Sequence, residues 1–234
     1  GEFCIFLDGD DWLETDAVKC LIEAYQSENC FIISTYKDAY LQNGTIKIVN
    51  NETPLGPEGH FVWNGYKESS MPYFRMNSSC YKLYDMHIIR ENGLFFDLTI
   101  QNGEDGLFVC QYLRYVKDIY YLPNQLWVIL NRPNSASRKP FNTAQMSIFR
   151  ALDRMEIISK TEEDKRFFEW RKSERAYYLG WKLIRSKNQD AQVIKEVGQR
   201  LRQGWATYIF GETKLRWKAK YLFMLFWYAC HTCK

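Results

Sequence analysis

Three carboxylates lie within four residues near the start of the chain, in the run Asp8-Gly9-Asp10-Asp11. Acids at this spacing repel one another unless a cation lies among them. Hard divalent cations prefer oxygen ligands, and Mg²⁺ commonly binds one or two carboxylates together with substrate phosphates. The run therefore predicts either a metal site or an Asp-Gly turn whose acids favour the start of the next helix. The spacing alone leaves both interpretations open.

Glu104 and Asp105 form a second acidic pair, at the start of a segment with helical periodicity. A carboxylate in this position is ordinarily a cap or a partner of the helix dipole. Beside an acidic metal site it would instead be a general base, which takes a proton while the other acids hold the cation. The pair by itself does not decide between these roles.

A third polar group is the loop at 132–138, which contains two arginines and two serines, among them Arg132 and Ser135. Guanidinium groups and hydroxyls suit phosphate oxygens, so the loop predicts a phosphate contact. The alternative is an ordinary surface loop whose charges are solvated.

The elements that would position these residues follow from the apolar pattern. The run from Phe3 to Leu7 predicts a strand buried on both faces. The acids then fall at its carboxyl end, where ligands bind in open α/β sheets. An amphipathic helix is expected next, from the apolar residues Val18, Leu21, Ile22 and Tyr25.

Later signals complete the outline. Asn43-Gly44 between two apolar runs predicts a β-hairpin. A short helix is expected at 80–90, and short strands at 119–122 and 126–130. The pattern is helical from Ala144 almost to the end. We therefore expect an α/β fold with a mixed sheet flanked by helices, followed by a helical C-terminal region. The expected domains are residues 1–140 and 141–234.

Composition narrows the class of protein. The chain has 234 residues, of which 46% are apolar and 25% charged, so it can bury a sizeable core and is not of the disordered class. Its seven scattered cysteines fit free thiols in a reducing compartment better than a disulfide framework. The longest apolar run, 221–230, is about half of what a membrane-spanning helix needs. These features predict a cytoplasmic protein.

Charge is distributed unevenly along the chain. Residues 1–159 hold 14 Lys and Arg against 20 Asp and Glu, whereas residues 160–234 hold 17 against 8. The basic end includes 214–230, which mixes cations with aromatic side chains. Such a segment either lies on the inner face of the cytoplasmic membrane or completes a hydrophobic core with a solvated basic face. No nucleic-acid-binding signature accompanies the charge, so we expect no nucleic-acid partner.

Several motifs, taken in order, resemble glycosyltransferase family 2 with the GT-A fold. The first is the D-x-D-D signature at Asp8–Asp11. The others are a KLY segment, a Gly-x-x-Phe, a GED-x-x-F motif and an Arg- and Ser-containing ending: Lys82-Leu83-Tyr84, Gly93–Phe96, Gly103–Phe108 and Trp127–Ser137. The resemblance covers residues 1–138 and implies a partial, Rossmann-like GT-A domain. It matches the C-terminal portion of the family's catalytic domain, without the usual first half.

What the resemblance implies is transfer of a sugar from a nucleotide-sugar donor, a UDP-sugar, to a hydroxyl group. Asp8 and Asp10 would hold Mn²⁺ or Mg²⁺. Asp105 would be the catalytic base of an inverting reaction, with Glu104 in support. The remaining assignments are donor contacts at Asp11, Arg132 and Ser135 and acceptor contacts at Trp12 and Lys82.

The acceptor implied by the resemblance is a saccharide or a lipid-linked saccharide, in the synthesis of surface polysaccharide. A membrane-surface position of 214–230 would suit such an acceptor. The alternative from a different class is a truncated, non-catalytic remnant that binds carbohydrate or a protein partner.

Overall fold

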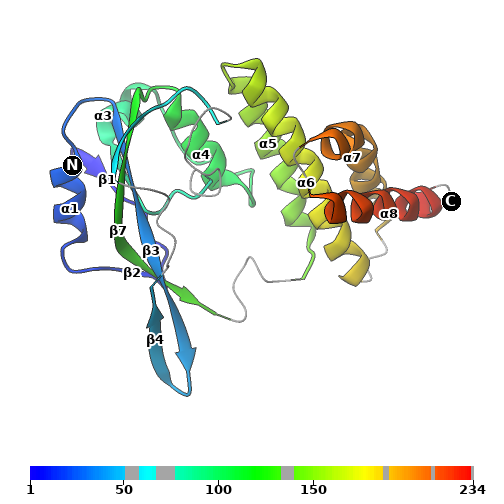
Figure 1. The fold of residues 1–234 in the computed structure, drawn as a ribbon, viewed down its shortest axis with the longest axis horizontal. Coiled ribbons are helices and arrows are strands. Elements are labelled where there is room, and N and C mark those ends of the chain that lie inside the picture. The colour runs from blue at the N-terminus through cyan, green and yellow to red at the C-terminus, as the bar shows by residue number, and fades with distance from the viewer. Residues whose placement is uncertain (51–57, 67–76, 133–139, 187–189, 212–213, 233–234) are drawn as a thin grey trace. The chain divides into compact units, whose positions relative to one another are not determined.

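The computed structural model describes residues 1–50, 58–66, 77–132, 140–186, 190–211 and 214–232 (Figure 1). The chain divides into two compact units. The first comprises residues 1–96 and 105–139, and the second comprises residues 97–104 and 140–234.

The first unit is built on a mixed sheet of seven strands. Its elements are β1 (Phe3–Cys4), β2 (Trp12–Leu13), α1 (Ala17–Ala24), β3 (Cys30–Gln42), β4 (Thr45–Val49), β5 (Gly59–Val62), β6 (Lys82–Asp85), α3 (Met86–Glu91), α4 (Glu104–Leu113) and β7 (Asp118–Asn131). The strand order is β1-β6-β3-β7-β2, with β4 beside β3 and β5 beside β7. β3 and β7 are parallel, and the other pairs are antiparallel. The predicted fold class is confirmed.

Helices cover both faces of this sheet (Figure 1). α1 packs against one face, where Ala17, Leu21 and Trp127 are fully buried together. α3 and α4 pack against the other face, around an aromatic cluster that includes Phe108 and Tyr112. The two cores fix the sheet between the helices, so the ends of its strands have defined positions.

The beginning of the chain differs from the prediction in two ways. β1 spans only Phe3–Cys4, is half-buried and runs antiparallel to β6, so the expected strand with two buried faces from Phe3 to Leu7 is wrong. In α1, Val18 and Ile22 are exposed, because the buried stripe consists of Ala17, Leu21 and Ala24.

Tertiary pairing also changes two later elements. Part of the helix expected at 80–90 is the strand β6, which is drawn into the sheet by pairing with β3 and β1, and α3 begins only after it. The two short strands expected around Pro123 form one strand, β7, whose register against β3 shifts between Tyr121 and Trp127. The irregular register accommodates Pro123, which has no backbone N–H to donate.

The hairpin prediction is confirmed. β3 and β4 pair up to Gln42 and Thr45, and the connecting Asn43 and Gly44 have φ values of 51° and 79°. Positive φ at both central residues is what a type I′ turn requires, and Asn-Gly adopts it at low cost.

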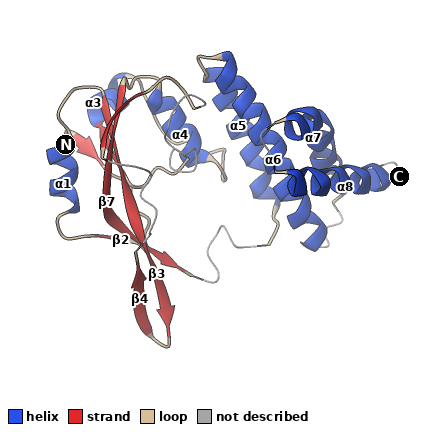
Figure 2. Ribbon diagram, in the orientation of Figure 1, coloured by secondary structure: helices blue, strands red, loops and turns tan. Residues whose placement is uncertain are grey.

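The second unit is helical, as the sequence predicts (Figure 2). Its elements are η2 (Thr143–Met146), α5 (Ser147–Ile158), α6 (Glu162–Ser186), α7 (Ala191–Phe210) and α8 (Leu215–Thr232). One face of α8 completes the core of this unit, since Tyr221, Met224 and Tyr228 are buried and the Tyr228 hydroxyl donates to Gly180 O at 3.3 Å. None of the helices described is both long and apolar enough to traverse a bilayer.

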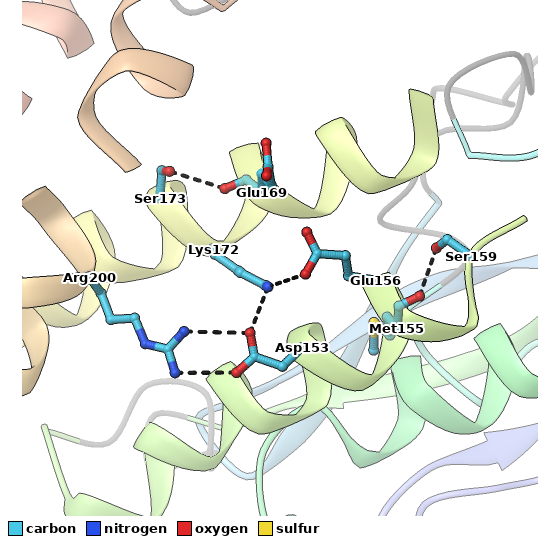
Figure 3. Close-up of polar contacts among 8 residues, drawn as sticks. All are labelled: Asp153, Met155, Glu156, Ser159, Glu169, Lys172, Ser173 and Arg200. Atoms are coloured by element: carbon cyan, nitrogen blue, oxygen red, sulfur yellow. Dashed lines mark hydrogen bonds and ion pairs between the residues drawn. The ribbon is translucent and has the colours of Figure 1, made fainter. Parts of the chain in front are cut away.

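An ion-pair network joins three helices of this unit (Figure 3). The ammonium of Lys172 on α6 lies 2.6 Å from Asp153 and 2.7 Å from Glu156, both on α5. Arg200 on α7 approaches the other oxygen of Asp153 at 3.2 Å. Asp153 is therefore shared by two cations from different helices.

Candidate functional site

The acidic run forms a turn that is tied to β7. The Asp11 amide donates to Asp8 O at 3.0 Å, which closes the turn. Leu130 on β7 donates its backbone N–H to Asp11 Oδ1 at 2.9 Å, and the Trp127 indole donates to Phe6 O at 3.4 Å. Because β7 lies inside the sheet, these bonds fix the turn against a rigid element.

The acids of this turn interact with one another and with the start of α4. Burial raises the pKa of Asp8, and the charges of Asp105 and Asp10 raise it further. Burial also raises the pKa of Asp11, against the lowering effect of the Leu130 hydrogen bond. Asp8 therefore lies within electrostatic reach of both Asp10 and Asp105, so the structure brings the two predicted acidic groups to one site.

Arg132 forms an ion pair with this cluster. Its Nε lies 3.3 Å from Asp10 Oδ2, and both side chains are partly exposed. The arginine thus stands at the end of β7, where solvent and a ligand can reach it. Ser135, the other predicted loop contact, lies outside the described residues.

Asp105 stands in the first turn of α4 and is half-buried. The Ser79 hydroxyl donates to its Oδ1 at 2.9 Å. Glu104, the first residue of the helix, is also half-buried. Asp105 is thus partly open to solvent and is held by a hydrogen bond from a neighbouring loop.

Lys82 has different surroundings from those expected of an acceptor contact, whereas the prediction for Trp12 stays open. Lys82 is completely buried, and its ammonium donates to Ser78 O at 2.6 Å and to Cys80 O at 3.1 Å. It offers no surface to an acceptor, because pairing of β6 with β3 turns it inward. Trp12 lies on β2, half-buried, opposite Val128 of β7.

Ser79 and Cys80 are residues of this site that sequence reasoning missed. Burial, followed by the charges of Asp8 and Asp105, raises the pKa of the Cys80 thiol to about 11, so the thiol stays neutral at pH 7. The Ser79 side chain is only 5% exposed. The one signal in the sequence is their place shortly before the KLY segment.

A divalent cation fits the chemistry of the acidic turn but would not be enclosed by protein ligands. The donors are carboxylate oxygens, which suit Mg²⁺ and Mn²⁺. Within the described ranges, no three His, Cys, Asp or Glu side chains are placed together as a ligand set. A cation here would therefore need oxygen atoms from a substrate, as Mg²⁺ sites with one or two carboxylates do.

Comparison with known proteins identifies the fold. Neither a protein-family model nor a curated protein sequence matches the chain. Solved structures do match the chain, and they match it in fold.

Among them are structures of a fragment, residues 1–349, of TarS from S. aureus. Its complex with UDP-GlcNAc has a TM-score of 0.59 and 16% identity, and the match covers 99% of this chain and 68% of that one. The complex with UDP has a TM-score of 0.55 at the same identity and coverage. At 16% identity the likeness concerns the fold.

Proposed function

We propose that this protein is a nucleotide-sugar-dependent, inverting glycosyltransferase of family 2. The observation that carries the proposal is the electrostatic interaction of Asp8 with both Asp10 and Asp105, which supports a common site for the D-x-D acids and a second carboxylate. The fold supports it, since the similar TarS structures contain UDP-GlcNAc and UDP. The order of the sequence motifs supports it independently.

In the proposed reaction, Asp105 accepts the proton of an acceptor hydroxyl as the hydroxyl oxygen attacks the anomeric carbon of the donor. The bond from that carbon to the nucleotide diphosphate breaks, and the diphosphate leaves with the bonding electrons. A single displacement of this kind inverts the anomeric configuration. Arg132 binds the diphosphate, because a guanidinium at the edge of the site pairs well with phosphate oxygens.

Asp8 and Asp10 would hold Mg²⁺ or Mn²⁺ together with the donor phosphates, and Asp11 would support the donor side. When bound, the cation neutralises negative charge on the diphosphate leaving group. The chain covers 68% of the length of the TarS fragment.

For the acceptor we propose a saccharide or a lipid-linked saccharide, in surface polysaccharide synthesis. The support is the exposed apolar face of α8, where Leu222, Phe223 and Phe226 are 50%, 55% and 70% exposed. Lysines and an arginine precede them on the same helix. Such a face suits the interface of an anionic membrane, where a lipid-linked acceptor would be found.

Calorimetry and a transfer assay test the proposal. The chain is titrated with UDP and UDP-GlcNAc, with and without Mn²⁺, and transfer to candidate acceptors is followed with the same donor. We expect nucleotide binding that Mn²⁺ strengthens, a loss of that strengthening in Asp10→Asn, and a loss of transfer but not binding in Asp105→Asn. Failure of the chain to bind any nucleotide would favour the non-catalytic alternative, and a fully active Asp105→Asn variant would reject the base.

A further inference from the structure

A buried cluster at the start of β6 surrounds Ser79, whose side chain donates to Asp105. Ser79, Lys82 and Tyr84 are 5%, 0% and 0% exposed. Lys82 and Tyr84 donate hydrogen bonds to backbone carbonyls of the loop before β6. Ser79, which belongs to this loop, donates to the Asp105 carboxylate. Complete burial of an ammonium group costs free energy, so the burial of Lys82 needs a structural or functional reason.

Three consecutive carbonyl groups are held by this cluster. The Lys82 ammonium donates to Ser78 O and Cys80 O, and the Tyr84 hydroxyl donates to Ser79 O at 2.9 Å. Burial raises the pKa of Tyr84 well above its usual value, so the phenol keeps the proton that it donates. The backbone on both sides of Ser79 is therefore fixed by side chains of the following strand.

The loop also contains a residue in an uncommon conformation. Tyr81 has a φ of 62°, a value that costs a non-glycine residue free energy. This conformation lets the chain turn back so that the Lys82 side chain reaches carbonyls two and four residues before it. The hydrogen bonds of the cluster keep the turn in place.

The result of the arrangement is the hydrogen bond from Ser79 Oγ to Asp105 Oδ1. A hydroxyl bound to one carboxylate oxygen fixes the rotation of the group and leaves the second oxygen to receive a proton. A general base works only within hydrogen-bond reach of the proton it takes, so its rotation matters for the rate.

We propose that Ser79 is a positioning residue for Asp105 in sugar transfer, and that Lys82 and Tyr84 hold Ser79 in place. The inference rests on the proposed function and adds to it the residues that orient the base. It also gives Lys82 a role that agrees with its burial.

Steady-state kinetics of single variants test the proposal. In Ser79→Ala we expect kcat for transfer to fall about 10- to 100-fold, as for a misplaced catalytic group, while the Kd for UDP changes less than about 2-fold. Ser79→Thr keeps a hydroxyl and should recover most of the rate. Tyr84→Phe loses only the hydroxyl that holds Ser79 O, and should lower kcat in the same sense as Ser79→Ala but less.

Ser173→Ala is the matched control, since Ser173 is 1% exposed and donates within α6, in the second unit. It should leave kcat unchanged. A wild-type kcat in Ser79→Ala would overturn the inference, and so would an equal loss of rate in Ser173→Ala. A wild-type chain that binds nucleotide but transfers no sugar would instead overturn the proposed function itself, before any variant is compared.

Discussion

Arg132 and Asp10 form an ion pair, with 3.3 Å between Nε and Oδ2, although they lie at opposite ends of the sequence of the first unit. The contact brings the end of β7 to the acidic turn after β1. Both side chains keep exposed surface, so their interaction is screened by water and contributes little to stability. In the proposed donor site, the arginine would place a positive charge beside acids that otherwise present only negative charge to a diphosphate.

Replacing this arginine should weaken nucleotide binding. In Arg132→Gln we expect the Kd for UDP to rise about 10-fold, which corresponds to about 1.4 kcal/mol, because a charge-assisted hydrogen bond to phosphate is lost. Calorimetry measures the change. Arg90→Gln, at an exposed position on α3, is the control and should bind as the wild type does. Equal affinities for all three proteins would exclude Arg132 from the donor site.

Gly103 precedes the acidic pair of α4 and cannot accept a side chain. Its φ is 92°, and a Cβ there would lie 2.6 Å from Ile148 Cδ1 and 2.9 Å from Ala151 Cβ. Both neighbours belong to α5, in the same unit as Gly103. A methyl group would therefore strain the backbone and overlap the helix at once.

The expected cost of Gly103→Ala is about 1–3 kcal/mol of stability, from the positive φ and the overpacking together. Urea denaturation followed by circular dichroism measures it. Gly59→Ala provides the comparison, because a Cβ at Gly59 meets nothing within 4 Å. If both variants unfold at the same urea concentration as the wild type, Gly103 is not in tight contact with α5.

Some of the fold follows from local sequence alone. The Asn43-Gly44 turn was predictable because its two residues accept positive φ wherever they occur, and the start of α4 because an acidic pair after glycine is a local signal. In the site, the approach of the acidic turn to Asp105 was expected only from the family resemblance. No local pattern relates positions so far apart.

The rest depends on contacts between distant segments. α1 buries two alanines rather than Val18 and Ile22, since small residues allow the helix to approach Trp127 on the sheet. Lys82 was expected in a short helix and as an acceptor contact, yet strand pairing of β6 with β3 buries it. Ser79 was missed because its importance comes from its hydrogen bond to Asp105, a residue distant in the sequence.

The ion-pair network of the second unit should make stability depend on pH. Burial alone would raise the pKa of Asp153, but hydrogen bonds from Lys172 and Arg200 outweigh it and lower the pKa below the usual 3.8 (Figure 3). A carboxyl whose pKa is lowered in the folded state contributes stability above its unfolded pKa. That contribution is lost as the pH falls through the lower, folded value.

Asp153→Asn should therefore cost about 1 kcal/mol near pH 7, a figure kept small because the carboxylate is more than a third exposed and screened by solvent. The difference from the wild type should stay constant down to about pH 5 and shrink below about pH 4. Urea denaturation at a series of pH values measures it. A difference that grows as the pH falls would contradict the lowered pKa.

The exposed face of α8 gives the last prediction. Tyr221, Met224 and Tyr228 face the core of the unit, which leaves Phe226 and its neighbours in contact with water, on the helix that also carries two lysines and an arginine. If this face binds an anionic membrane, the chain should sediment with vesicles that contain phosphatidylglycerol and not with neutral ones. Raising the salt concentration should weaken binding, because the Debye length shortens.

Phe226→Ser should lower the vesicle partition coefficient about 10-fold, as expected when one buried aromatic side chain is lost from the interface. Ile157→Ser is the matched control, since Ile157 on α5 is 77% exposed and lies outside α8. Equal losses in both variants would point to non-specific adsorption of apolar surface. If the chain bound neutral vesicles as strongly as anionic ones, the lysines would have no role in membrane binding. The proposed position of the protein beside a lipid-linked acceptor would then lose its support.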